Sequence, residues 1–121
     1  MYTNKILSIL DAYMADNPGD IGKGIAEDFK RRRVERGMTR EEVAKEAGIS
    51  VSNLIRFERT GLISLHNLIA LAISFGYVSE IKNIFSEPKF TTLEELSFIR
   101  KNANRKRGHK NENRPPFSQL P

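Results

Sequence analysis

The side chains with the most informative types and spacing lie close to position 50. Ser52, Asn53 and Arg56 fall on one side of a predicted helix, so they can act together on one surface. Asparagine pairs well with adenine and arginine with guanine in the major groove of DNA, and Val51 could touch a thymine methyl group. The alternative for Ser50, Ser52 and Asn53 is helix-start chemistry, because short polar side chains also favour the cap and first turn of a helix.

Further residues around this segment are candidates for contacts with DNA phosphates. Arg40 opens another predicted helix, where its own charge and the helix N-terminus both favour an anion. The alternative is an ordinary exposed arginine near Glu41 or Glu42. The phosphate candidates are Thr39, Arg40, Ser50 and Arg59.

Two short helices that meet at Gly48 must position these side chains. Thr39 and Glu42 have the T-x-x-E spacing of a capping box, which predicts the start of the first helix. Gly48 supplies the positive φ that a sharp reversal needs, and Ser50 can cap a second helix at about residues 51–59. The apolar residues expected to face inward are Val43, Ala44, Ala47, Leu54 and Phe57.

The sequence over roughly residues 20–76 resembles the helix-turn-helix of the XRE (Cro and phage-repressor-like) family. The matching positions are Ile25, Phe29, Arg33, Gly37, Thr39, Glu42, Val43, Ala44, Gly48, Ile49, Leu54, Glu58 and Gly61. The chain departs from the family pattern at several places. Arg40 and Val51 stand where glutamines are frequent, Arg32 stands at a commonly apolar position, and Thr60 is an extra residue before the loop glycine.

The resemblance implies a sequence-specific DNA-binding transcriptional regulator, a repressor, that reads a palindromic operator as a homodimer. It also implies that Arg33 and Glu58 form a structural ion pair between the first helix of the domain and the end of the recognition helix. A weaker resemblance, in the apolar run after residue 61 and the basic tail, is to small regulators paired with HipA-type kinase toxins. This second resemblance implies an antitoxin that binds its toxin and autoregulates its operon.

The rest of the chain predicts more helices and no strand, so the expected fold is all-α. It comprises a five-helix phage-repressor-like domain, an extra N-terminal helix and a short C-terminal helix. The predicted divisions are residues 1–19 for the N-terminal helix and linker, 20–86 for the DNA-binding domain, and 87–121 for the C-terminal extension with its mobile basic tail. The predicted helix starts are Thr3, Asp20, Ser64, Ser79 and Thr92. In the helix after Asp20, we expect Ile21, Ile25 and Phe29 to point inward. The short helix after Ser79 should contain Ile81, Ile84 and Phe85.

The N-terminal apolar stripe of Ile6, Leu10 and Tyr13 could form a dimer contact or a cover over the core. The sequence favours neither the dimer contact nor the cover over the other.

Positive charge is concentrated in two segments of this chain of net charge +5. Residues 21–61 hold ten Lys and Arg against seven Asp and Glu, and residues 100–121 hold seven against one. Basic segments attract DNA phosphates through counterion release. The tail residues that could bind DNA or a toxin are Arg100, Lys101, Arg105, Lys106, Arg107 and Lys110, although a solubility tail is the alternative.

The chain offers little for catalysis. It has two histidines, His66 and His109, and shows no glycine-rich phosphate loop, metal-ligand spacing or nucleophile elbow. We therefore expect no enzyme activity, no cofactor and no metal. Without cysteine, an apolar run of membrane-spanning length or a signal peptide, the protein is expected in the cytoplasm, nucleoid-associated when bound to DNA.

Overall fold

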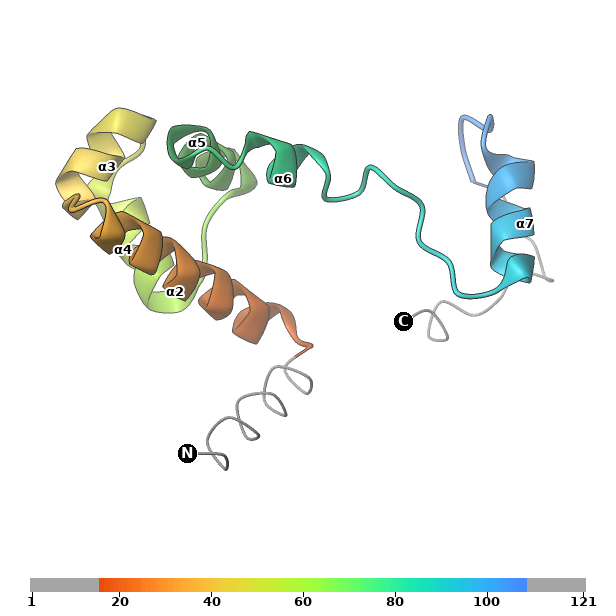
Figure 1. The fold of residues 1–121 in the computed structure, drawn as a ribbon, viewed down its shortest axis with the longest axis horizontal. Coiled ribbons are helices and arrows are strands. Elements are labelled where there is room, and N and C mark those ends of the chain that lie inside the picture. Colours follow the sequence, from red (N-terminus) through yellow and green to blue (C-terminus); the bar gives the residue numbers. More distant parts are fainter. Residues whose placement is uncertain (1–15, 109–121) are drawn as a thin grey trace, which may run out of the picture. The chain divides into compact units, whose positions relative to one another are not determined.

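The computed structural model describes residues 16–108, and every regular element in this part of the chain is a helix, without strands (Figure 1). The all-α prediction is confirmed. The helices are α2 (Pro18–Glu35), α3 (Arg40–Ala47), α4 (Val51–Thr60), α5 (Leu65–Phe75), α6 (Val78–Lys82) and α7 (Leu93–Asn102). The chain divides into two compact units, and the boundary lies between Ile81 and Lys82. The N-terminal helix that the sequence predicts lies outside the described residues.

Helix α2 begins two residues earlier than predicted. The helix starts at Pro18 instead of Asp20, with Asn17 as the N-cap, whose Oδ1 accepts a hydrogen bond from Asp20 N at 2.9 Å. Pro18 occupies the first turn, where its missing N–H costs nothing. Residues 17–19, which the sequence analysis placed in the linker, are therefore the start of a helix.

The inward face of α2 also differs from the prediction. Ala26 and Arg33 are buried and Phe29 packs against the core, whereas Ile21 and Ile25 are about half exposed. The reason is the position of Gly22, which lies against the backbone at the end of α4. This contact turns the stripe of Gly22, Ala26, Phe29 and Arg33 inward and leaves the two isoleucines beside it.

Gly22 and Gly61 bring two backbones unusually close together. A Cβ atom on Gly22 would lie 2.9 Å from Gly61 O, and one on Gly61 would lie 2.5 Å from Gly22 C. Gly61 also has a φ of 79° as the C-cap of α4. No residue with a side chain fits at either place without movement of a helix, so the pair sets where α4 ends against α2.

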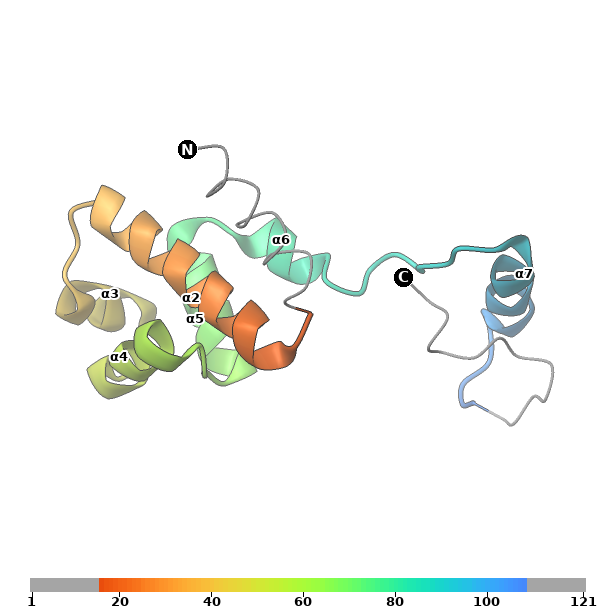
Figure 2. The same ribbon diagram turned by 90° about the horizontal axis from the view of Figure 1, so that it is seen from below.

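The core of the first unit lies where α2, α3, α4 and α5 meet (Figures 1 and 2). The Phe29 ring packs between Phe57 and Phe75, with centroid separations of 5.9 and 4.8 Å. Such tilted aromatic pairs add to the burial of their apolar surface. The buried residues of this core are Ala26, Val43, Ala44, Leu54, Phe57, Leu71 and Phe75.

Arg36, the C-cap of α2, ties this helix to the end of α5. Its Nη2 donates to Phe75 O at 3.1 Å, and its guanidinium lies 4.4 Å from the centre of the Phe75 ring. The arginine therefore satisfies a carbonyl at the end of α5 and adds a cation–π contact.

Helix α6 is shorter than predicted. It covers Val78–Lys82, so Ile84 and Phe85 lie beyond it, and Phe85 is 95% exposed. After α6, Ser86 Oγ donates to Asn83 O at 3.2 Å, a local hydrogen bond that competes with continuation of the helix.

The second unit contains α7, which starts at Thr92 as predicted; Thr92 and Glu95 have the T-x-x-E spacing of a capping box but form only half of it. Thr92 Oγ1 accepts from Glu95 N at 3.1 Å, as expected of the cap. The Glu95 carboxylate, which is buried, instead accepts from Thr91 N and Thr91 Oγ1 at 2.9 and 3.1 Å. The glutamate thus binds the residue before the cap.

Candidate nucleic-acid interface

Helices α3 and α4 are joined by a tight reversal at residues 48–50. Thr39 and Glu42 form the capping box of α3, with the Thr39 Oγ1 to Glu42 N distance at 3.1 Å. Gly48 ends α3 with a φ of 73°, and Ser50 caps α4 by accepting from Asn53 N at 3.1 Å. The predicted caps and the predicted turn at Gly48 are present, and α4 runs one residue past the expected end.

The outward face of α4 carries the predicted base contacts. Ser52, Asn53 and Arg56 are exposed, while Leu54 and Phe57 on the same helix are fully buried. Val51, the candidate for contact with a thymine methyl group, is less accessible than these three, because it is half-buried and packs against the core. The helix therefore presents a polar surface whose geometry is fixed by the core behind it.

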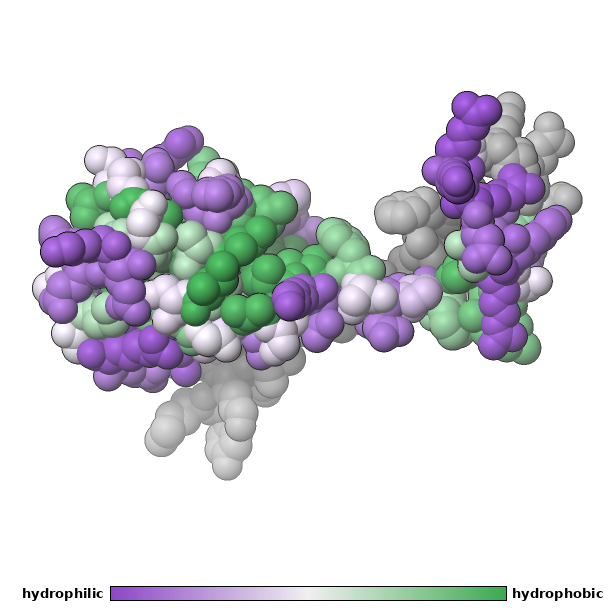
Figure 3. Space-filling view, turned by 90° about the horizontal axis from the view of Figure 1, so that it is seen from above, coloured by the Kyte–Doolittle hydropathy of each residue, from purple (hydrophilic) through white to green (hydrophobic). Residues whose placement is uncertain are grey.

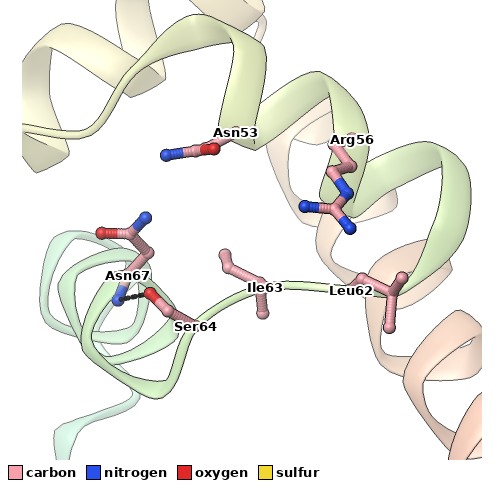
Figure 4. A pocket seen from close by; sticks show the side chains of 6 residues that line it. All are labelled: Asn53, Arg56, Leu62, Ile63, Ser64 and Asn67. Atoms are coloured by element: carbon pink, nitrogen blue, oxygen red, sulfur yellow. Dashed lines mark hydrogen bonds between the residues drawn. The ribbon is translucent and has the colours of Figure 1, made fainter.

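A hollow of about 400 Å³ lies beside this face, between α4 and the beginning of α5. In Figure 4 the amide groups of Asn53 and Asn67 reach toward it from opposite sides, and the Arg56 guanidinium enters it along α4. The lining residues are Asn53, Arg56, Leu62, Ile63, Ser64 and Asn67.

Asn67 is not among the residues predicted for the site, although the sequence carries a signal for it. The spacing S-x-x-N occurs at Ser50–Asn53 and again at Ser64–Asn67, and in both cases the serine Oγ accepts from the asparagine N at 3.1 Å. The same cap therefore places an asparagine in the first turn of two successive helices. The tertiary structure puts these two asparagines at one hollow.

The phosphate candidates lie around the ends of the two helices. Thr39 and Ser50 are exposed, and each hydroxyl oxygen already accepts a backbone N–H, which leaves the O–H free to donate. Arg59 is exposed in the last turn of α4. Arg40 is half exposed in the first turn of α3, with a partner that the sequence analysis did not foresee.

That partner is Glu58, whose carboxylate also binds Arg33. Arg33 Nε lies 2.8 Å from Glu58 Oε2 and its Nη2 lies 3.0 Å from Oε1, so the expected ion pair is formed. Arg40 Nε donates to the same Oε1 at 3.1 Å. One carboxylate, with its side chain only 2% exposed, thus joins α2, α3 and α4.

The C-terminal basic residues do not all lie where the sequence placed them. Arg100 and Lys101 were predicted in a mobile tail but form the last turn of α7, where cations interact favourably with the helix dipole. Arg105, Lys106 and Arg107 follow the helix and are exposed. Lys110 lies outside the described residues.

Metal-binding and membrane-spanning features are absent from the described part of the chain. Within residues 16–108, no three His, Cys, Asp or Glu side chains gather closely enough to hold a metal ion. Over this described range, too, no helix combines the length and the apolar character needed to cross a membrane.

Comparison with known sequences identifies the fold. A search of curated proteins found no match to this chain. The family model described as "Helix-turn-helix" matches residues 29–82, a segment that begins within α2 and includes α3, α4, α5 and α6. Together with the geometry of α3, Gly48 and α4, this match shows that residues 29–82 form a DNA-binding helix-turn-helix domain of the XRE family.

Proposed function

We propose that the protein is a sequence-specific transcriptional repressor that binds a palindromic operator as a homodimer. The observation that carries this proposal is the polar face of α4, where Ser52, Asn53 and Arg56 are exposed directly behind a turn of helix-turn-helix geometry. In proteins of this architecture the recognition helix enters the major groove and its first residues contact base edges.

The base contacts are assigned by side-chain chemistry. Arg56 offers two parallel N–H donors to guanine, and Asn53 offers a donor and an acceptor to adenine. Ser52 can donate to or accept from either kind of base, and the exposed part of Val51 contacts a thymine methyl group. Asn67 joins this set from α5, because it shares the hollow with Asn53 and Arg56.

The phosphate contacts surround this set. Arg40 and the hydroxyl of Thr39 bind the backbone at the start of α3, and the Ser50 hydroxyl and Arg59 bind it at the two ends of α4. Such contacts fix the register of the protein on the duplex and carry affinity rather than sequence information.

Self-association is supported by the surface of α5. This helix contains no Asp, Glu, Lys or Arg, and Leu65 and Ile73, eight residues apart, are each more than 60% exposed. Figure 3 shows apolar side chains gathered on the face of the first unit that carries α5. A charge-free apolar surface allows two copies of a basic protein to approach, which a palindromic site requires.

The second candidate function is an antitoxin that binds a HipA-type kinase toxin and represses its own operon. The observation that favours it lies in the second unit, where Phe85 and Leu93 are 95% and 82% exposed. Large apolar side chains at such exposure, in a unit whose helix α7 ends in Arg100 and Lys101, suit a protein partner.

Selection of bound duplexes from a random DNA pool, followed by size analysis of the complex, tests the proposal. We expect the recovered sequences to share a palindrome with half-sites about one helical turn apart, bound by two protein chains. Recovery of unrelated sequences, or binding by one chain, would contradict it.

A matched pair of variants then tests the recognition helix. Arg56→Ala should weaken operator binding by about 1–3 kcal/mol and relax the preference at one base pair in each half-site. Arg31→Ala removes the same charge from an exposed position on α2 and should leave the preference unchanged. Co-purification of a toxin that binds the second unit would favour the antitoxin function over a repressor that acts alone.

A further inference from the structure

The carboxylate of Glu58 holds two arginines in different ways. Arg33 binds both oxygens through Nε and Nη2, and its Nη1 donates to Met38 O at 2.9 Å. Arg33 is buried, so each side of its guanidinium is used inside the protein. It is a structural residue, because three of its five N–H donors are bonded inside the protein and its burial keeps the other two from a ligand.

Arg40 uses only one edge of its guanidinium. Its Nε donates to Glu58 Oε1 at 3.1 Å, and neither Nη atom makes a hydrogen bond with any of the described residues. The side chain is 40% exposed although the carboxylate beneath it is almost completely buried. Four N–H donors therefore remain on an arginine whose inner edge is fixed.

The fixed edge matters because an arginine normally loses much rotamer freedom when it binds an anion. A guanidinium that is already oriented by a buried carboxylate loses less of that freedom, and its planar fork matches two phosphate oxygens. Glu58 cannot easily turn away, since three N–H groups from two helices donate to it.

We propose that Glu58 is a positioning residue, which orients Arg40 so that its two Nη groups bind one operator phosphate as a fork. The inference rests on the proposed function and adds to it. The carboxylate lies in the last turns of α4 and Arg40 in the first turn of α3, so one group holds both the phosphate contact and the recognition helix. Phosphate binding at Arg40 is then linked to the placement of α4 in the groove.

The test compares lysine substitutions at two arginines. Arg40→Lys keeps the charge but loses Nε and the fork, whereas Arg59→Lys changes an exposed arginine of α4 for which the structure shows no such carboxylate partner. On a duplex recovered by the wild-type protein, we expect Arg40→Lys to weaken binding about 3- to 10-fold. Arg59→Lys changes a phosphate contact that no buried carboxylate orients, and it should weaken binding less than Arg40→Lys, because a point charge suffices there.

Two further measurements separate positioning from charge and from folding. The dependence of log K on log salt should be the same for Arg40→Lys as for the wild type, while Arg40→Ala should reduce the slope by about one. Denaturant midpoints of the arginine variants should stay close to wild type, since an ion pair with one exposed partner contributes little to stability. An affinity loss at unchanged slope and stability is the signature of a lost orientation.

Glu58→Gln examines the carboxylate itself. In this background Arg40→Ala should cost less affinity than in the wild type, because the fork is no longer held. If Glu58→Gln fails to fold, the comparison of Arg40→Lys with Arg59→Lys tests the proposal by itself. Neither lysine variant removes Glu58, the partner of Arg33.

Equal effects at positions 40 and 59, or wild-type affinity for Arg40→Lys, would overturn the positioning role and leave the repressor function standing. If the wild-type protein recovers no duplex from the pool, the proposed function itself fails, and the role of Glu58 with it.

Discussion

The contact between Gly22 and Gly61 makes opposite predictions for two neighbouring glycines of α2. Gly22 would place a Cβ atom 2.9 Å from Gly61 O, whereas a Cβ atom on Gly24 would meet nothing within 4 Å. Both residues lie inside the same helix, two positions apart. Gly22→Ala and Gly24→Ala therefore differ only in what the new methyl group meets.

The magnitudes follow from two opposing terms. Replacement of glycine by alanine in a helix interior stabilises a protein by about 0.5–1 kcal/mol, because the unfolded chain has less freedom to lose. Gly24→Ala should show this gain in full. At position 22 the methyl group overlaps a backbone oxygen that cannot rotate away, and overpacking of this kind costs about 1–3 kcal/mol. Gly22→Ala should therefore be destabilised by about 1–2 kcal/mol.

Urea unfolding followed by far-ultraviolet circular dichroism measures both variants. We expect the midpoint to rise for Gly24→Ala and to fall for Gly22→Ala, with similar m-values. If Gly22→Ala were stabilised as much as Gly24→Ala, the close approach of α2 to the end of α4 would be refuted. The wild-type protein and the double variant complete the comparison, and the two effects should add unless the helices shift together.

Further predictions concern the turns, the core and the C-terminal segment. Gly61→Ala should destabilise the protein by more than Gly48→Ala in urea unfolding, because both have positive φ but only Gly61 meets a backbone within 4 Å. Phe57→Ala should lower the free energy of unfolding by about 3–5 kcal/mol, since the ring is 1% exposed at the centre of the core; a loss below 1 kcal/mol would contradict that placement. Ser50→Ala should cost about 1 kcal/mol through loss of the α4 cap, detectable as a lower thermal midpoint. Truncation after Asn102 should weaken DNA binding and reduce its salt slope while the preferred operator stays the same, as a competition assay with operator variants can check.

The local features of the domain could be predicted from the sequence because they depend on short-range chemistry. The Thr39–Glu42 capping box, the left-handed Gly48 and the Ser50 cap involve residues no more than three positions apart, or a single backbone conformation. The periodicity of α4 likewise separates Leu54 and Phe57 from Ser52, Asn53 and Arg56, because a helix repeats every 3.6 residues. These features locate the polar face of the recognition helix.

Only the tertiary structure decided which of several apolar faces is buried and which polar groups meet. Ile21 and Ile25 fit a helical period as well as Ala26 does. Which face of α2 is buried depends on the contact between Gly22 and Gly61, two residues that lie 39 positions apart in the chain. The meeting of Arg40 with Glu58, and of Asn53 with Asn67 at one hollow, likewise joins different helices. Local propensity carries no information about such contacts, because they depend on how the helices pack.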